Sequence, residues 1–163
     1  MNYFELFGFK EAPVIDKSLV AAKYFELQKQ YHPDFFTKGT SEEQEQALKF
    51  SADINKAFSI FRDEQRTIEY FLQVKGAIAA DEKFALPSDF LMEMMEINEV
   101  VSDGNNVQAE QVVGEYEAKL INEITPVLKN YEQNAESPEQ LQLLKAYYYK
   151  KKYLNRILDR LAD

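Results

Sequence analysis

The stretch VAAKYFELQKQYHPDF, residues 20–35, decides the fold, because it holds a long amphipathic helix and the signal that ends it. Apolar and aromatic residues recur at helical spacing along one face, at Val20, Tyr24, Leu27 and Tyr31. Pro33 disfavours helical backbone at the residue before it, so the helix must end by His32. The stretch therefore predicts a helix that begins after the N-cap Asp16 and is followed by a loop over 32–40.

Helical periodicity dominates the rest of the chain as well, and only five glycines and five prolines interrupt it. We expect an all-α protein with six helices, at about residues 3–7, 16–31, 41–74, 88–102, 107–131 and 137–161. Ser41 and Gln44 have capping-box spacing at the start of the third helix, and Gly76 is the expected stop after it. Pro126 should kink or break the fifth helix near its end.

The predicted helices fall into two groups. Residues 1–75 hold a short first helix and a helical hairpin, and residues 88–163 hold a three-helix bundle. Residues 76–87 between them show no helical pattern and look like a linker.

Composition excludes several classes of function. The chain has no cysteine, which excludes disulfides, thiolate catalysis and cysteine-ligated zinc. Its net charge is −9, so binding to nucleic acid is not expected, and the acidic balance favours a partner with a basic surface. We find no stretch typical of a membrane span and no signal-peptide pattern at the N-terminus. We therefore expect a cytoplasmic protein that does not bind membranes.

The sole histidine lies in the tripeptide His32-Pro33-Asp34, at the predicted end of the hairpin. The stiff proline holds an imidazole and a carboxylate on either side of it, which suits docking to another protein. An ordinary turn is the competing interpretation, in which the histidine only interacts with the helix C-terminus.

An enzyme would need parts that the sequence lacks. There is one histidine, no cysteine, no Gly-x-Ser-x-Gly elbow, no phosphate-binding glycine loop and no tight carboxylate cluster for a metal. We expect no catalytic residues, no cofactor and no metal site.

The helix at 88–102 has apolar residues on two sides. At about 100° per residue, one narrow core stripe is predicted, made of Phe90, Met94, Ile97 and Val101. Three further apolar residues lie outside this stripe among two glutamates: Leu91, Met92 and Met95, with Glu96 and Glu99. Either this second face packs inside the protein or it binds a partner, for which methionines are well suited.

The last helix carries an apolar stripe and a cluster of aromatic and basic residues. The predicted stripe is Leu141, Leu144, Tyr148, Ile157 or Leu158, and Leu161. Tyr149 and Tyr153 lie off this stripe, either as surface tyrosines or as anchors for a partner. Lys150, Lys151 and Lys152 are interpreted as a solvated face.

Residues 1–75 resemble the J domain of DnaJ-like co-chaperones. The resemblance rests on Tyr3-Phe4-x-Leu6-Phe7-Gly8, the His-Pro-Asp tripeptide and Ile54-Asn55-Lys56-Ala57-Phe58, in the family's order and spacing. It implies that an ATPase chaperone is contacted, and its hydrolysis triggered, by His32, Pro33 and Asp34. Supporting cations would be Lys23, Lys29 and Lys38. This chain departs from general J domains because Phe25 and Glu26 interrupt the basic patch and Phe35 follows the tripeptide.

The whole chain resembles the HscB family of co-chaperones, through the motifs YFxLFG, LQxQYHPDxF, INxAF and FLMExxE. The resemblance implies a DnaK/HscA-type ATPase as one partner and an IscU-type iron–sulfur scaffold as the other. Scaffold contacts would come from Leu91, Met92, Met95, Glu96, Glu99 and Tyr153. We expect a monomer. A J-domain protein with a different client, or a non-catalytic helical adaptor, remains the alternative.

Overall fold

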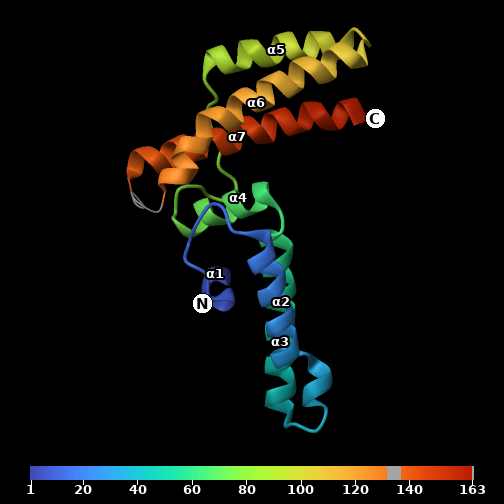
Figure 1. Ribbon diagram of the computed structural model, residues 1–163, viewed down its shortest axis with the longest axis vertical. Helices are drawn as coiled ribbons and strands as arrows, with labels where there is room; N and C mark the ends of the chain where they lie inside the picture. Colours follow the sequence, from blue (N-terminus) through green and yellow to red (C-terminus); the bar gives the residue numbers. More distant parts are fainter. Residues whose placement is uncertain (132–136, 163) are drawn as a thin grey trace. The chain divides into compact units, whose positions relative to one another are not determined.

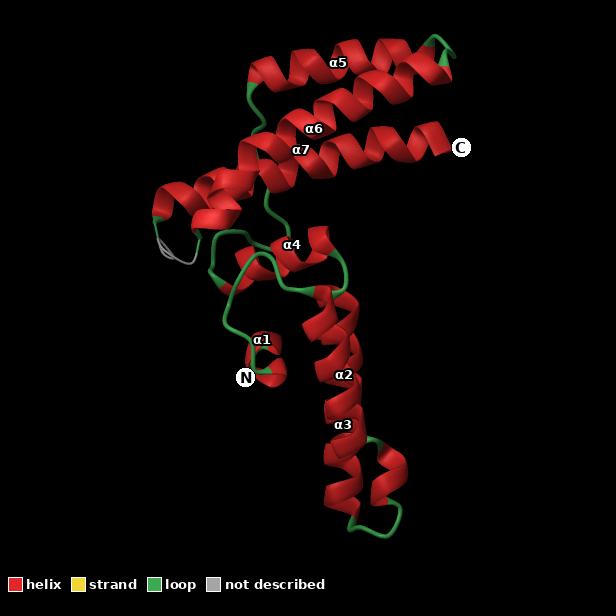
Figure 2. Ribbon diagram, in the orientation of Figure 1, coloured by secondary structure: helices red, strands yellow, loops and turns green. Residues whose placement is uncertain are grey.

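The computed structural model describes residues 1–131 and 137–162, and over these ranges the chain forms only helices and loops (Figure 2). The all-α prediction is confirmed. The chain divides into two compact units, Met1–Lys75 and Gly76–Asp163, and each is described by itself.

The first unit is a helical hairpin with smaller helices packed on it (Figure 1). Its elements are α1 (Tyr3–Phe7), α2 (Lys17–Tyr31), the 3₁₀-helix η1 (Pro33–Phe36), α3 (Ser41–Phe61) and α4 (Glu64–Val74). The Asp16 carboxylate accepts a hydrogen bond from the Ser18 N–H at 2.8 Å, so α2 begins where the sequence predicted. Helix α3 contacts all four other elements of the unit and is its central support.

Aromatic side chains of α1 are buried in this unit's core. The Phe4 and Phe7 rings lie 5.0 and 5.5 Å from the ring of Phe61 on α3. The Tyr70 hydroxyl on α4 accepts a hydrogen bond from the Tyr3 N–H at 2.9 Å, and burial raises the pKa of that hydroxyl. These contacts fix α1 and α4 against the hairpin.

One long helix was predicted over residues 41–74, and the structure corrects this to two helices. The chain turns at Arg62 and Asp63, and the Asp63 carboxylate caps α4 by accepting a hydrogen bond from the Arg66 N–H at 2.9 Å. The Thr67 hydroxyl donates to the Ile60 carbonyl at 3.0 Å across the break. An aspartate that bonds the backbone three residues ahead competes with helix continuation, which explains the break.

The cap at the start of α3 also differs from the prediction. Thr40, rather than Ser41, is the N-cap, and it forms a reciprocal capping box with Glu43. Both possible pairs have capping-box spacing, and the shift of one residue reflects the choice between two adjacent hydroxyl side chains.

The second unit is a bundle of α5 (Ser88–Ser102), α6 (Asn106–Asn130) and α7 (Pro138–Ala162) (Figure 1). Its core cluster consists of Phe90, Met94, Ile97, Val113, Leu120, Leu154 and Ile157. The predicted stripe of α5 is confirmed, with Val101 packed at its edge. On α7, Leu144 and Tyr148 are buried as predicted, but the buried Leu154 was missed because the cluster of tyrosines and lysines before it obscures the apolar period.

Pro126 was predicted to kink or break this helix; α6 continues through the proline, so it is not broken there. The Thr125 hydroxyl donates a 2.6 Å hydrogen bond to the Ile121 carbonyl in the preceding turn. The proline removes only the N–H that would bond the Asn122 carbonyl, and only a short stretch of helix remains beyond it, so the cost of keeping the helix is confined to its last turns.

Residues 82–86 of the segment predicted as a linker are attached to α7. The Glu82 carboxylate accepts hydrogen bonds from Lys145 Nζ at 2.6 Å and from the Tyr149 hydroxyl at 3.3 Å. The Phe84 ring stacks on Tyr149 with centroids 4.7 Å apart. The lysine hydrogen bond lowers the pKa of Glu82, so this carboxylate is ionised at neutral pH.

Candidate functional site

The end of the α2–α3 hairpin exposes the His-Pro-Asp tripeptide. His32 is at once the C-cap of α2 and the N-cap of η1, and Pro33 is the first residue of η1. The side chains of His32 and Asp34 are 46% and 85% exposed. We call residues 32–36 the hairpin tip. Its backbone is set by two helix ends, while its two ionisable side chains remain accessible to a partner.

Hydrogen bonding at the hairpin tip selects one form of the histidine ring. Nδ1 of His32 accepts a hydrogen bond from the Asp34 N–H at 3.2 Å and lies 3.5 Å from Asp34 Oδ2. In this arrangement the neutral ring carries its proton on Nε2, the only remaining donor of the ring. A protonated ring would instead place two opposite charges side by side.

The three cations predicted to support docking differ in availability. Lys23 forms an ion pair with Glu26 at 3.3 Å, and its side chain is 30% exposed. Lys29 and Lys38 are exposed, and no ion pair is found for either among residues 1–131 and 137–162. Of these three lysines, the two most available to a partner are therefore the two nearest the hairpin tip in the sequence.

Two large aromatic side chains are also exposed around the hairpin tip. Phe25 on α2 is 64% exposed and Phe35 on η1 is 66% exposed. The Phe35 ring packs edge-on against His32, with centroids 6.1 Å apart. Apolar surface thus accompanies the charges, and the sequence signalled it only as an interruption of the basic patch.

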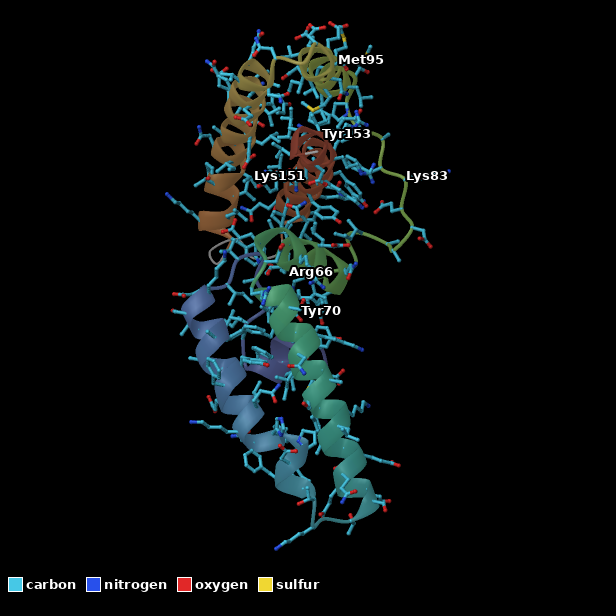
Figure 3. All side chains as sticks on the ribbon, turned by 90° about the vertical axis from the view of Figure 1, so that its right-hand side faces the viewer. Arg66, Tyr70, Lys83, Met95, Lys151 and Tyr153 are labelled. Carbon is cyan, nitrogen blue, oxygen red and sulfur yellow. The ribbon has the colours of Figure 1, made fainter. Side chains whose placement is uncertain are left out.

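The second apolar face of α5 is exposed. Met92 and Met95 are each 64% exposed and Leu91 is 38% exposed. Glu96 and Glu99 are exposed beside them. We call these five residues the α5 outer face, and Met95 marks it in Figure 3. This face was expected either to pack inside the protein or to bind a partner, and its exposure excludes packing inside the bundle.

A groove of about 340 Å³ lies beside the α5 outer face, between α5 and α6. Glu93, Glu96 and Glu115 line it around an apolar floor that includes Ile97 and Val112. Burial, followed by the nearby Glu93 carboxylate, raises the pKa of the groove's Tyr116 to about 12. The sequence carries no signal for this groove, because its α6 residues become neighbours of α5 only in the folded bundle.

Tyr153, predicted as a scaffold contact, is half-buried. Its ring packs edge-on against Phe90 with centroids 5.9 Å apart, and it borders the core cluster. It is carried by α7, whereas Met95 is on α5 (Figure 3). Tyr153 is therefore a partly exposed side chain whose ring also supports the core stripe of α5.

The lysines at 150–152 are drawn into contacts within the second unit. Lys151 pairs with Glu117 at 3.0 Å with only 14% of its side chain exposed. Lys150 and Lys152 lie over the rings of Phe90 and Tyr148, each 5.8 Å from the ring centroid. Of the three lysines, Lys151 therefore has its charge paired with a carboxylate, while Lys150 and Lys152 pack against aromatic rings.

No helix in the part of the chain that the structure covers is long and apolar enough to span a membrane. No group of three or more histidine, cysteine, aspartate or glutamate residues there is arranged to hold a metal ion.

Comparison with known proteins agrees with the all-helical fold. The family model for the HSCB C-terminal oligomerisation domain matches residues 86–162. The co-chaperone protein HscB of Proteus mirabilis is 34% identical over 122 residues, which cover 74% of this chain and 70% of the relative. The HscB homologue of Shewanella baltica strain OS155 is 32% identical over the full length of both chains.

Solved structures show the same likeness. The crystal structure of human co-chaperone protein HscB matches with a TM-score of 0.80 at 23% identity, covering 99% of this chain and 81% of that one, and supports the fold alone. HscB from Vibrio cholerae matches with a TM-score of 0.63 at 29% identity over 99% of both chains. Fold and site together define a J-domain co-chaperone. Within this class, the chain belongs to the HscB family.

Proposed function

We propose that this protein stimulates ATP hydrolysis by a DnaK/HscA-type chaperone and delivers to it an IscU-type scaffold for iron–sulfur cluster assembly. The observation that carries the proposal is the exposure of His32, Pro33 and Asp34 at the hairpin tip of a chain from a co-chaperone family. In a chain of this family, these two side chains are accessible at the place where a chaperone would dock.

The hairpin tip is proposed to dock on the ATP-bound chaperone. Asp34 supplies a carboxylate and His32 a ring donor, while Lys29 and Lys38 add positive charge that no carboxylate of the described residues neutralises. Docking promotes hydrolysis only if the hairpin tip binds the hydrolysis-competent state more tightly than the resting state. The protein then modulates an ATPase and performs no covalent chemistry itself.

The α5 outer face is proposed to hold the scaffold. Leu91, Met92 and Met95 supply apolar area, and methionine side chains adapt their shape to a partner. Glu96 and Glu99 border this area with negative charge, which favours a scaffold surface with cations around an apolar centre. Tyr153 extends the contact onto α7. A monomeric and cytoplasmic protein remains our expectation.

The test is single-turnover ATP hydrolysis by the cognate DnaK-type chaperone, with the wild-type protein and with His32→Gln. We expect stimulation by the wild type and hydrolysis at the unstimulated rate with the variant. His32 is half exposed, so the variant should fold normally, which circular dichroism would check.

Addition of the scaffold then tests the client. Scaffold should raise the stimulation further with the wild type and should bind His32→Gln unchanged. If the protein stimulates ATP hydrolysis by none of the cognate chaperones, the helical-adaptor alternative is favoured. Stimulation without scaffold binding would leave a J-domain protein with a different client.

A further inference from the structure

The methionines of α5 differ sharply in their surroundings. The chain has four methionines, and three of them lie on this helix. Met94 is fully buried at 0% exposure, whereas Met92 and Met95 are each 64% exposed on the α5 outer face. Solvent therefore reaches Met92 and Met95 but not Met94. The two accessible methionines lie on the surface proposed to hold the scaffold.

An accessible thioether reacts with peroxides. The sulfur lone pair attacks one oxygen of hydrogen peroxide, and the O–O bond breaks as the S–O bond forms. The departing hydroxide takes the proton of the attacked oxygen and leaves as water. The sulfur is oxidised to the sulfoxide and the peroxide is reduced. Burial excludes the peroxide, so Met92 and Met95 should react much faster than Met94.

The side chains beside Met92 and Met95 on the α5 outer face cannot donate a hydrogen bond to a sulfoxide oxygen. A sulfoxide oxygen carries partial negative charge and needs a hydrogen-bond donor when it is buried. On the α5 helix, Glu96 and Glu99 lie four residues after Met92 and Met95, within side-chain reach. Carboxylates accept hydrogen bonds and repel the oxygen, so the α5 outer face offers no partner for it.

We propose that Met92 and Met95 form a reversible oxidation site, at which peroxide converts the α5 outer face from apolar to polar and releases the client. The inference rests on the proposed scaffold-binding function of this face. Enzymatic reduction of the two sulfoxides would restore the apolar surface. The hairpin tip contains no methionine, so its stimulation of the chaperone should not respond.

The experiment treats the full-length protein with a limited amount of hydrogen peroxide and measures each site by peptide mass spectrometry. We expect sulfoxide at Met92 and Met95 at least tenfold faster than at Met94. Affinity for the IscU-type scaffold should fall about tenfold or more, because a desolvated sulfoxide lacks a partner. Methionine sulfoxide reductase should restore it.

The matched control is the double variant Met92→Leu, Met95→Leu, which keeps the apolar area without a thioether. Whatever the affinity of this variant for the scaffold before treatment, peroxide should leave that affinity unchanged. Oxidation of both methionines with no loss of affinity would overturn the inference and leave the proposed function intact. An equal loss of scaffold affinity after peroxide in the double variant would show that oxidation acts at another site, and this would also overturn the inference. Absence of scaffold binding before any treatment would refute the proposed function and the inference together.

Discussion

The hairpin tip and the α5 outer face are both exposed, but they present different chemistry. The hairpin tip shows an imidazole and a carboxylate held by two helix ends, with the exposed Lys29 and Lys38 close by in the sequence. The α5 outer face shows three flexible apolar side chains bordered by glutamates. The first suits recognition of a defined charge pattern, and the second suits an adaptable apolar contact. This difference is what the proposal of two partners with different surfaces requires.

The largest expected effect separates the two surfaces. Replacing Leu91, Met92 and Met95 together by serine should weaken scaffold binding at least about 100-fold, because each removes buried apolar area in the complex. Stimulation of the chaperone without scaffold should stay at the wild-type level. Isothermal titration and single-turnover hydrolysis would measure the two properties. A loss of both would mean that the surfaces do not act independently, and thermal unfolding would show whether the variant is folded.

A smaller effect on scaffold binding and on stability is expected at Tyr153, whose ring packs against the core residue Phe90. Tyr153→Ala removes the edge-on contact with Phe90 and should lower the free energy of unfolding by about 2 kcal/mol, with weaker scaffold binding. Tyr153→Phe keeps the ring and should restore stability, so any remaining binding defect belongs to the hydroxyl. Urea unfolding and titration of both variants check this. Equal stability of the alanine variant and the wild type would show that the ring is not part of the core.

The cations around the hairpin tip should contribute less and unequally. Lys29→Ala should reduce stimulation about two- to fivefold at low salt, with a smaller effect at high salt as screening increases. Lys23→Ala should have less effect because Glu26 already neutralises that lysine. Hydrolysis rates across a salt series would measure both. A larger effect at Lys23 than at Lys29 would contradict this ranking, and Glu26→Gln should increase the contribution of Lys23.

The smallest effect concerns the attachment of residues 82–86 to α7. The lysine hydrogen bond lowers the folded-state pKa of Glu82 below its ordinary value of 4.5. The carboxylate therefore stabilises the fold above that value, and its contribution is lost as the pH falls through the folded-state pKa. Glu82→Gln should increase amide exchange over 82–86 about two- to threefold at pH 7. The difference from the wild type should vanish in acid, and a difference that persists there would exclude the ion pair as its cause.

Local signals in the sequence were sufficient for much of the fold. Asp16 and Pro33 specify both ends of α2, and the stripe of Phe90, Met94 and Ile97 correctly gave the buried side of α5. Prediction was wrong where local signals competed. Asp63 divides the expected long helix because its carboxylate caps a new one, and Pro126 is accommodated within α6. Sequence alone ranks such competing signals poorly because packing decides between them.

The sequence by itself determined the helical class, the position of the His-Pro-Asp tripeptide at a helix end and the angular position of Leu91, Met92 and Met95. These features depend on residues a few positions apart, whose geometry the helix period sets. Only the tertiary structure decided that the α5 outer face is exposed, that Tyr153 supports Phe90, and that Glu82 is attached to Lys145. These outcomes depend on which segments become neighbours in space, and helical periodicity carries no information about that.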